Sequence, residues 1–215
     1  MEDLVIYGAG GFGREVAYLI EKINEQRATW NIKGFIEDNE ANIGKMVNGY
    51  PILGTGEWLL SYNQKINVVI AVGSTLGKKI IYNKLKNCKN IEFPNIIHPG
   101  VSISSTNKLG VGNIICEGVI MTCNINISNF VSLHVNCTLG HDVRVDDFST
   151  ILPNSSISGN VHLNEGVYFG TNATIIQNIK VGEYSIIGAG AVVIRDIPAY
   201  CTAVGIPAKP IKFHQ

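Results

Sequence analysis

Large apolar side chains recur at every sixth position over nearly a hundred residues of this chain, without a change of phase. The positions are Ile97, Ile103, Leu109, Ile115, Met121, Ile127, Leu133, Leu139, Val145, Ile151, Ile157, Leu163, Phe169, Ile175, Val181, Ile187 and Val193. With 46% of all residues hydrophobic, chance would produce this series only about once in 10⁵ trials. A strand repeats every two residues and a helix every 3.6 or so, so neither explains a period of six.

A period of six is typical of a parallel β-helix built from hexapeptides. In such a prism each hexad supplies one short strand and one corner, and the large residue points inward. Four positions after most of the large residues stands a small one that fits the turn, for example Cys137, Ser149 and Ala173. Gly and Asn, which tolerate unusual backbone angles, recur near the expected corners. We therefore predict a β-helix over residues 93–215, stabilised by the stacking of its coils.

The first 92 residues follow a different pattern, in which strand-like and helix-like runs alternate. Apolar runs at residues 4–7, 30–38 and 68–72 predict strands, and residues 13–23 and 78–86 have helical character. Strands that alternate with helices predict a parallel sheet with crossover helices. We therefore expect two domains, an α/β domain over residues 1–92 and the β-helix after it.

A glycine-rich loop follows the first strand and matches G-x-G-x-x-G, the fingerprint of a dinucleotide site. The backbone N–H groups that would form the anion site, together with the start of the next helix, belong to Gly8, Gly10, Gly11, Phe12 and Gly13. A full dinucleotide fold needs two mononucleotide halves, and the chain has room for one before the hexads begin. We therefore expect a half-Rossmann domain that binds one diphosphate carrying a nucleoside and a sugar, and not NAD. The alternative is that the glycines serve only a tight turn.

The composition excludes several classes of partner. The chain has 17 basic and 17 acidic side chains and no run of Lys or Arg, so nucleic acid is not expected to bind. No apolar run approaches the roughly 18 residues that span a bilayer, and no secretory signal is visible. The five cysteines include no C-x-x-C pair, which argues against a zinc knuckle and a disulfide framework. We expect a cytoplasmic protein with no membrane partner and no metal.

Several segments together resemble a known family. They are "IYGAGGFG", "FIED", "IAVGS", "LGHDVRV", "ISGNVHLNEGVYFGTNATI" and "AVGIPAKPIK". The chain resembles the left-handed β-helix acyltransferases, and most closely the bacterial sugar acetyltransferases of the sialic-acid and nucleotide-aminosugar group, which include UDP-4-amino-sugar and GDP-perosamine N-acetyltransferases. In that family the helices form homotrimers, and acetyl-CoA lies in the groove between neighbouring helices. The resemblance implies an acetyl-CoA-dependent enzyme that acetylates the amino group of a nucleotide-linked sugar.

The resemblance also implies a catalytic pair. Acetyl transfer to an amine needs a base that takes its proton, and histidine suits this role because its ordinary pKa is near 6.5. His141 occupies the place of the family's catalytic histidine, and Asp142 matches the acidic residue that raises its basicity. Neighbours on a strand point to opposite faces, so Asp142 can reach His141 only if the pair lies at a corner.

Binding residues carry over in the same way. Glu37 and Asp38 align with the acidic pair that recognises the nucleotide base, Gly73 lines the same crevice, and His134 stands where an asparagine often lies near the sugar. The positions that match contacts to acetyl-CoA or substrate are Thr150, Gly159, Gly170, Thr171 and Ala189. Thr150 departs from the family pattern, because some members have a histidine there. Small residues in tight coils also have a purely structural explanation.

Three other functions stay open. The motifs do not separate amine from hydroxyl acceptors, so the acceptor could be a hydroxyl of a sialic acid or another sugar. Some hexapeptide helices are zinc hydratases, and His98 and His134 are two coils apart with His141 nearby. A non-catalytic nucleotide-sugar sensor is the third alternative, and the retained His141–Asp142 pair argues against it.

Overall fold

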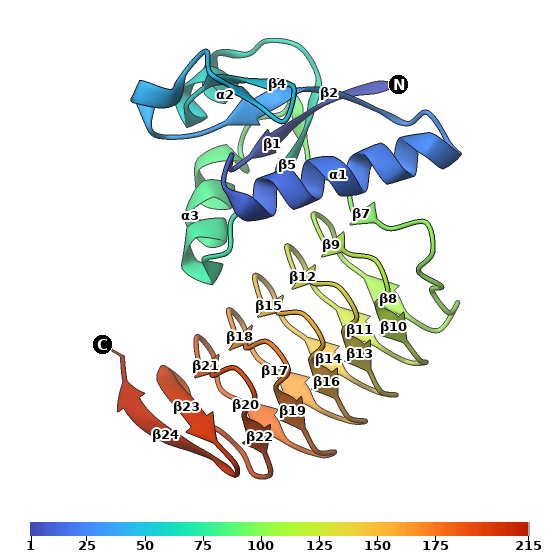
Figure 1. Ribbon diagram of the computed structural model, residues 1–215, viewed down its shortest axis with the longest axis vertical. Helices are drawn as coiled ribbons and strands as arrows, with labels where there is room; N and C mark the ends of the chain where they lie inside the picture. The colour runs from blue at the N-terminus through green and yellow to red at the C-terminus, as the bar shows by residue number, and fades with distance from the viewer. Residues whose placement is uncertain (215) are drawn as a thin grey trace. The chain divides into compact units, whose positions relative to one another are not determined.

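The computed structural model describes residues 1–214, and it divides into two compact units, Met1–Pro99 and Gly100–Gln215 (Figure 1). The first unit is an α/β domain, and the second consists of the coils of a β-helix. Each unit is described by itself below.

A six-stranded sheet with the order β3-β4-β2-β1-β5-β6 forms the centre of the first unit. Its strands are β1 (Glu2–Tyr7), β2 (Trp30–Ile36), β3 (Met46–Val47), β4 (Tyr50–Gly54), β5 (Ile66–Ile70) and β6 (Ile91–Glu92). β1 pairs in parallel with both β2 and β5, whereas the short β3 runs antiparallel to β4. Leu4, Val5 and Ile6 of β1 are fully buried, as expected for the central strand of a parallel sheet.

The helices of this unit are α1 (Gly11–Gln26), α2 (Gly56–Ser61) and α3 (Thr75–Leu85), with a 3₁₀ turn at Glu40–Asn42. α1 buries Val16, Leu19 and Ile20 on one face, which is the amphipathic pattern that the sequence predicted. The side chains of Thr55 and Ser74 cap α2 and α3. The unit contains one mononucleotide half, as predicted. The hairpin β3–β4 and helix α2 were not predicted, because such short elements show no clear period.

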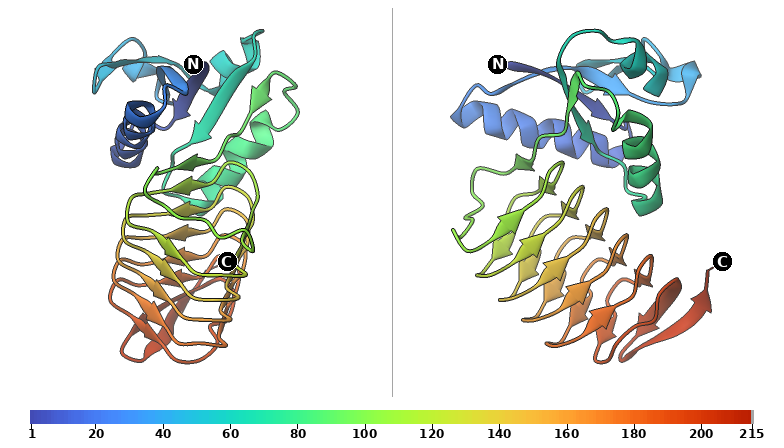
Figure 2. Two further views of the ribbon diagram at one scale, coloured as in Figure 1. Left: turned by 90° about the vertical axis from the view of Figure 1, so that its right-hand side faces the viewer. Right: turned by 180° about the vertical axis from the view of Figure 1, so that it is seen from behind.

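The second unit is a β-helix of two-residue strands, as the period predicted, and of the left-handed type that the family resemblance implied (Figure 2). Its strands, with the first at the end of the preceding unit, are β7 (Ile96–Ile97), β8 (Lys108–Leu109), β9 (Ile114–Ile115), β10 (Ile120–Met121), β11 (Asn126–Ile127), β12 (Ser132–Leu133), β13 (Thr138–Leu139), β14 (Arg144–Val145), β15 (Thr150–Ile151), β16 (Ser156–Ile157), β17 (His162–Leu163), β18 (Tyr168–Phe169), β19 (Thr174–Ile175), β20 (Lys180–Val181), β21 (Ile186–Ile187) and β22 (Val192–Val193). They pair in parallel in three sheets: β8-to-β20, β10-to-β22, and an eight-stranded sheet that contains β7, β9, β12, β15, β18 and β21. Leu139 pairs with Ile157, so one coil takes eighteen residues.

The hexads are confirmed over most of their length. Each predicted inward residue from Ile115 to Val193 is buried. The prediction is wrong at Ile103, which is 38% exposed and lies outside every strand of the described chain. The β10-to-β22 sheet begins one coil later, so Ile103 has no paired strand to hold it inward. Ile97 and Leu109, in the same first coil, are half-buried.

Asparagine and aromatic residues occupy the corners in the left-handed backbone region. Asn124, Asn136, Asn154 and Asn160 have φ between 56° and 60°, a conformation in which Asn and Asp are favoured. One corner carries stacked rings, with centroids 5.6 Å apart for Phe130 and Phe148 and 5.8 Å apart for Tyr184 and Tyr200. The segment "AVGIPAKPIK" contributes to a closing antiparallel hairpin, β23 (Cys201–Gly205) and β24 (Ala208–Phe213).

Candidate active site

The glycine loop lies at the carboxyl edge of the parallel sheet, between β1 and α1. The N–H of Gly8 donates to the carbonyl of Ile36 at 2.8 Å, which ties the loop to the end of β2. Gly8 has φ +115°, and a Cβ there would lie 2.6 Å from the carbonyl oxygen of Ala71. A Cβ on Gly13 would collide with the carbonyl of Gly8. The tight turn therefore explains these two glycines.

Gly10 and Gly11 have no such explanation. A Cβ on Gly10 would meet no described atom within 4 Å, and at Gly11 it would meet only Nη2 of Arg14, at 4.0 Å. Gly10 has φ −72°, which any residue adopts, so its backbone conformation does not require a glycine. The first turn of α1 contains no acidic side chain. An open surface beside a helix N-terminus and a guanidinium favours an anion.

The predicted acidic pair follows β2 at the same edge of the sheet. The Tyr7 hydroxyl donates to both carboxylate oxygens of Asp38, at 2.8 and 2.9 Å, and the N–H of Gly56 donates to Oδ1 at 3.0 Å. Asp38 remains an exposed residue. Oε1 of Glu37 accepts a hydrogen bond from Asn42 at 2.8 Å.

Gly73 follows β5 at the same edge, and a Cβ there would meet no described atom within 4 Å. The loop glycines, the acidic pair and Gly73 are therefore all brought to one edge of the first unit, at the carboxyl ends of its strands. This is where ligands bind in open α/β sheets.

Sequence reasoning missed two side chains at this edge, Tyr7 and Arg14. Tyr7 is 3% exposed, and its burial, together with the hydrogen bond to Asp38 and that carboxylate's charge, raises the pKa of its hydroxyl. The hydroxyl therefore stays protonated and acts as a donor. The signal for Tyr7 was its place directly before the glycine loop, and the signal for Arg14 was its place in the first turn of α1.

In the second unit, His141 and Asp142 lie at a corner between β13 and β14. Asp142 has φ +62°, and this turn brings its carboxylate back to its neighbour, with Oδ2 2.8 Å from Nδ1 of His141. The side chains are 64% and 50% exposed. The pair therefore lies at a corner, which is the arrangement that Asp142 needs in order to reach His141. A proton on Nδ1 that is donated to Asp142 leaves Nε2 as the basic nitrogen, open to a substrate.

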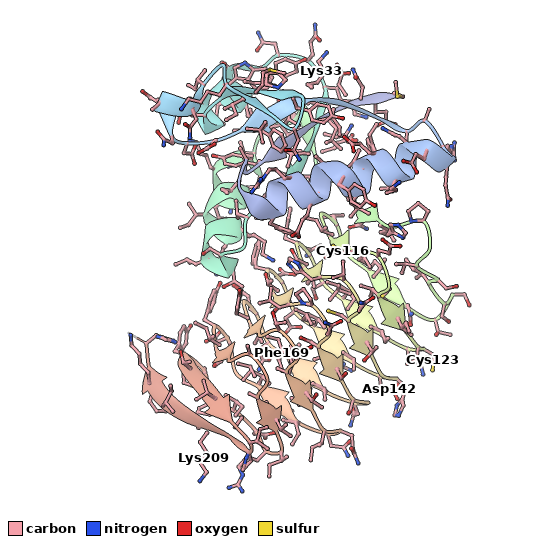
Figure 3. All side chains as sticks on the ribbon, in the orientation of Figure 1. Lys33, Cys116, Cys123, Asp142, Phe169 and Lys209 are labelled. Carbon is pink, nitrogen blue, oxygen red and sulfur yellow. The ribbon has the colours of Figure 1, made fainter. Side chains whose placement is uncertain are left out.

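The ionised form of Asp142 is stabilised from two sides. Hydrogen bonds from His141 and from the side chain of Asn124, which stands one coil earlier, lower the pKa of Asp142. Figure 3 shows Asp142 and Cys123 at the tips of neighbouring coils, and the N–H of Asp142 donates to the Cys123 carbonyl at 3.1 Å. At neutral pH this carboxylate is therefore negatively charged beside the imidazole.

Gly159 stands one coil after His141 and lies beneath its ring. A Cβ at this position would be 2.5 Å from Nε2 and 2.6 Å from Cε1 of His141. A Cβ on Gly140 would in turn lie 2.7 Å from the backbone nitrogen of Gly159, so Gly140 packs closely against that backbone. Because Gly159 has no side chain, the imidazole of His141 can lie against its backbone. This role of Gly159 does not depend on any contact with a cofactor.

Within the second unit, the remaining predicted residues do not lie at the His141 corner. Thr150, in β15, and His134, directly after β12, lie on the eight-stranded face of the prism, which is opposite the His141 corner. Gly170, Thr171 and Ala189 lie beyond the strands of that sheet, near another corner. A Cβ on Gly170 would lie 2.6 Å from the nitrogen of Ala189, so close packing explains this glycine.

Residues 1–214 contain neither a cluster of metal-ligating side chains nor a helix suited to crossing a membrane. No group of three or more His, Cys, Asp or Glu in this part of the chain is arranged to hold a metal ion. None of the helices described above has both the length and the apolar character that crossing a membrane requires.

Comparison with known proteins extends the similarity to the whole chain. Residues 3–85 match the PglD N-terminal domain family. The acetyltransferase domain of PglB from Neisseria gonorrhoeae, solved with acetyl coenzyme A, is 28% identical with a TM-score of 0.87, and the match covers 98% of this chain and 99% of that one. WeeI from Acinetobacter baumannii is 27% identical with a TM-score of 0.86, over 98% of this chain and 100% of that one.

PerB from Caulobacter crescentus, solved with CoA and GDP-perosamine, is similar in fold, with 24% identity, a TM-score of 0.88, and 99% and 98% of the two chains covered. No curated protein sequence matches the chain. The domain match at the N-terminus and the whole-length matches to acetyltransferases agree with each other. The chain is therefore an acyltransferase that joins a PglD N-terminal domain to a left-handed β-helix, and it resembles the bacterial sugar N-acetyltransferases in both.

Proposed function

We propose that this protein transfers the acetyl group of acetyl-CoA to the amino group of a nucleotide-linked amino sugar. The observation that carries the proposal is the exposed His141–Asp142 pair, with Nδ1 and Oδ2 2.8 Å apart, in a chain that matches PglB over nearly its whole length. PglB was solved with acetyl coenzyme A, and PerB with CoA and a nucleotide-linked sugar.

The chemistry needs one base and a well-placed amine. The amine nitrogen attacks the thioester carbonyl, and Nε2 of His141 takes a proton from it. The new C–N bond forms as the C–S bond breaks, and the proton passes from the imidazolium to the departing sulfur of CoA. Asp142 stabilises the imidazolium between these two steps, because its carboxylate accepts the hydrogen bond from Nδ1.

The nucleotide part of the substrate binds at the sheet edge of the first unit. Its diphosphate lies against the open backbone of Gly10 and Gly11, where no Cβ blocks its approach, and Arg14 supplies positive charge. Its base lies at Asp38, whose carboxylate accepts N–H groups. One diphosphate is the expected ligand, since the domain holds only one mononucleotide half.

We include a homotrimer in the proposal, because the family that the chain resembles forms trimers and because the residues that match cofactor contacts are divided between two corners. Gly159 is at the His141 corner, whereas Gly170, Thr171 and Ala189 are near a different corner of the same prism. A single prism therefore cannot offer both groups to one acetyl-CoA, but the corner of a second copy can supply the missing part. Light scattering should give three times the chain mass, and a fully active monomer would refute this.

Thiol release measured with a panel of acceptors tests the activity. UDP-, GDP- and dTDP-linked amino sugars are offered beside sialic acids, with acetyl-CoA as donor. The proposal expects thiol release with at least one amino sugar nucleotide, and release with sialic acid alone would show O-acetylation instead. A cytoplasmic location is part of the proposal, because the donor acetyl-CoA is available there.

A further inference from the structure

We propose that Tyr7 is a positioning residue for nucleotide recognition: with the N–H of Gly56, its hydroxyl fixes the carboxylate of Asp38 so that one oxygen reads a ring N–H of the base. The inference rests on the proposed function, in which Asp38 contacts the base of a nucleotide sugar. It adds to that function a role for Tyr7, an orientation for the Asp38 carboxylate and a preference among nucleotide bases.

The hydrogen bonds to Asp38 determine what the carboxylate still offers. A carboxylate has about four lone-pair positions, two on each oxygen. Oδ1 accepts from the Tyr7 hydroxyl at 2.8 Å and from the N–H of Gly56 at 3.0 Å, and Oδ2 accepts from Tyr7 at 2.9 Å. The hydroxyl has a single proton, which it shares between the two oxygens, so Oδ2 receives no donor of its own and keeps an acceptor position for a ligand. Asp38 is exposed, so a ligand can reach this position.

Tyr7 can hold this orientation because its own position is fixed. The residue ends β1, immediately before the glycine loop, and it is 3% exposed. Gly56 leaves room for the hydroxyl, since a Cβ there would be 2.5 Å from the Tyr7 oxygen and 2.9 Å from Nζ of Lys84. Burial and the neighbouring carboxylate raise the pKa of the hydroxyl, so it remains a donor at neutral and mildly alkaline pH.

A single acceptor selects bases by their ring nitrogens. Uracil and thymine carry an N–H at N3, and guanine carries one at N1, so each can donate to Oδ2. Adenine and cytosine present a lone pair at the corresponding ring nitrogen, which the carboxylate repels. The arrangement therefore predicts that uridine, thymidine and guanosine diphosphates bind better than those of adenosine and cytidine, because a polar group left unpaired is costly.

Calorimetry on the full chain tests the inference with UDP, dTDP, GDP, ADP and CDP as probes. Tyr7→Phe removes only the hydroxyl, and we expect the affinity for the preferred diphosphates to fall on the order of tenfold, with a smaller advantage over ADP. In turnover assays the KM for the sugar nucleotide should rise while kcat stays within about twofold, since the reaction takes place at His141. A purely structural role of Tyr7 would lower the amount of active enzyme, and hence apparent kcat, without changing KM.

Two further variants complete the experiment. Tyr50→Phe is the matched control, because the Tyr50 hydroxyl bonds Glu21 at 3.0 Å on an exposed surface, and its affinities should equal those of the wild type. In an Asp38→Asn background, Tyr7→Phe should cost little more, because Tyr7 acts through Asp38. Additive losses in this double-mutant cycle would overturn the inference.

The wild-type titrations separate the inference from the proposed function. If the wild type binds none of the five diphosphates, nucleotide recognition itself is refuted, and the proposed substrate with it. If the wild type binds a diphosphate and Tyr7→Phe binds it equally well, only the role of Tyr7 is refuted. Equal binding of ADP and UDP by the wild type would refute the base preference.

Discussion

Gly159→Ala should inactivate the enzyme without unfolding it. The three nearest atoms to a Cβ at this position all belong to the His141 ring, at 2.5, 2.6 and 3.0 Å. Ordinary carbon contacts are about 3.5 Å, so the ring must move by about 1 Å. The His141 side chain is 64% exposed and can turn into solvent, so the free energy of unfolding should hardly change. A displacement of about 1 Å at a reacting group costs roughly 10²-fold in rate.

The assay is thiol release at saturating acetyl-CoA and acceptor, together with thermal unfolding of the same samples. We expect kcat to fall about 10²-fold and Tm to stay within a few degrees. Gly188→Ala is the matched control, because its Cβ would meet the side chain of Val204, at 2.6 Å, and not a reacting group. An unchanged kcat would refute the reasoning. An unchanged kcat with a raised KM for acetyl-CoA would show instead that Gly159 acts as a cofactor contact.

Three other perturbations follow from the same structure. His141→Asn should lower kcat by roughly 10²–10⁴-fold with an unchanged fold, and Asp142→Asn should lower it less, as measured by thiol release and circular dichroism. Gly10→Val should abolish calorimetric binding of the nucleotide without lowering Tm, because its side chain meets open space, whereas Gly13→Ala should lower Tm because a Cβ there collides with backbone. Burial lowers the pKa of Lys78 to about 7, so above this pH the unfolded chain holds one proton more and stability should rise with pH, by about 2 kcal/mol between pH 7 and 9. Chemical denaturation at both pH values should show this rise, and Lys78→Met should remove it.

The sequence predicts the β-helix well because the six-residue spacing of its large apolar residues can be read without knowledge of the fold. Each hexad has a large apolar residue at the same phase, and from Ile115 onward every such residue is buried. The prediction fails at Ile103 because burial there depends on a paired strand, and pairing is a property of neighbouring coils rather than of the hexad itself. The hairpin β3–β4 was missed for a related reason, since two to five residues are too few to display a period.

The candidate site likewise contains some residues that the sequence could assign and others that it could not. His141 and Asp142 are adjacent in sequence and belong to a recognisable segment, so their pairing needed only the corner to be established. Tyr7 and Gly56 could not be assigned from the sequence, because they meet at Asp38 from 31 positions before it and 18 positions after it. Such contacts depend on the packing of β1, β2 and α2. The role of Gly159 beneath the imidazole was hidden for the same reason.

The pairing of residues eighteen positions apart limits how a protein like this can change in length. An insertion of six residues within the coils would carry every later side chain to the next face of the prism, and one of twelve residues would carry it to the face after that. Placed between His141 and Gly159, either insertion would remove Gly159 from beneath His141. Only the gain or loss of a whole coil leaves the later faces in register, whereas insertions of any other size must bulge out at a corner. Length differences among proteins that keep this site should therefore come in steps of eighteen, or as loops that leave the stack of coils intact.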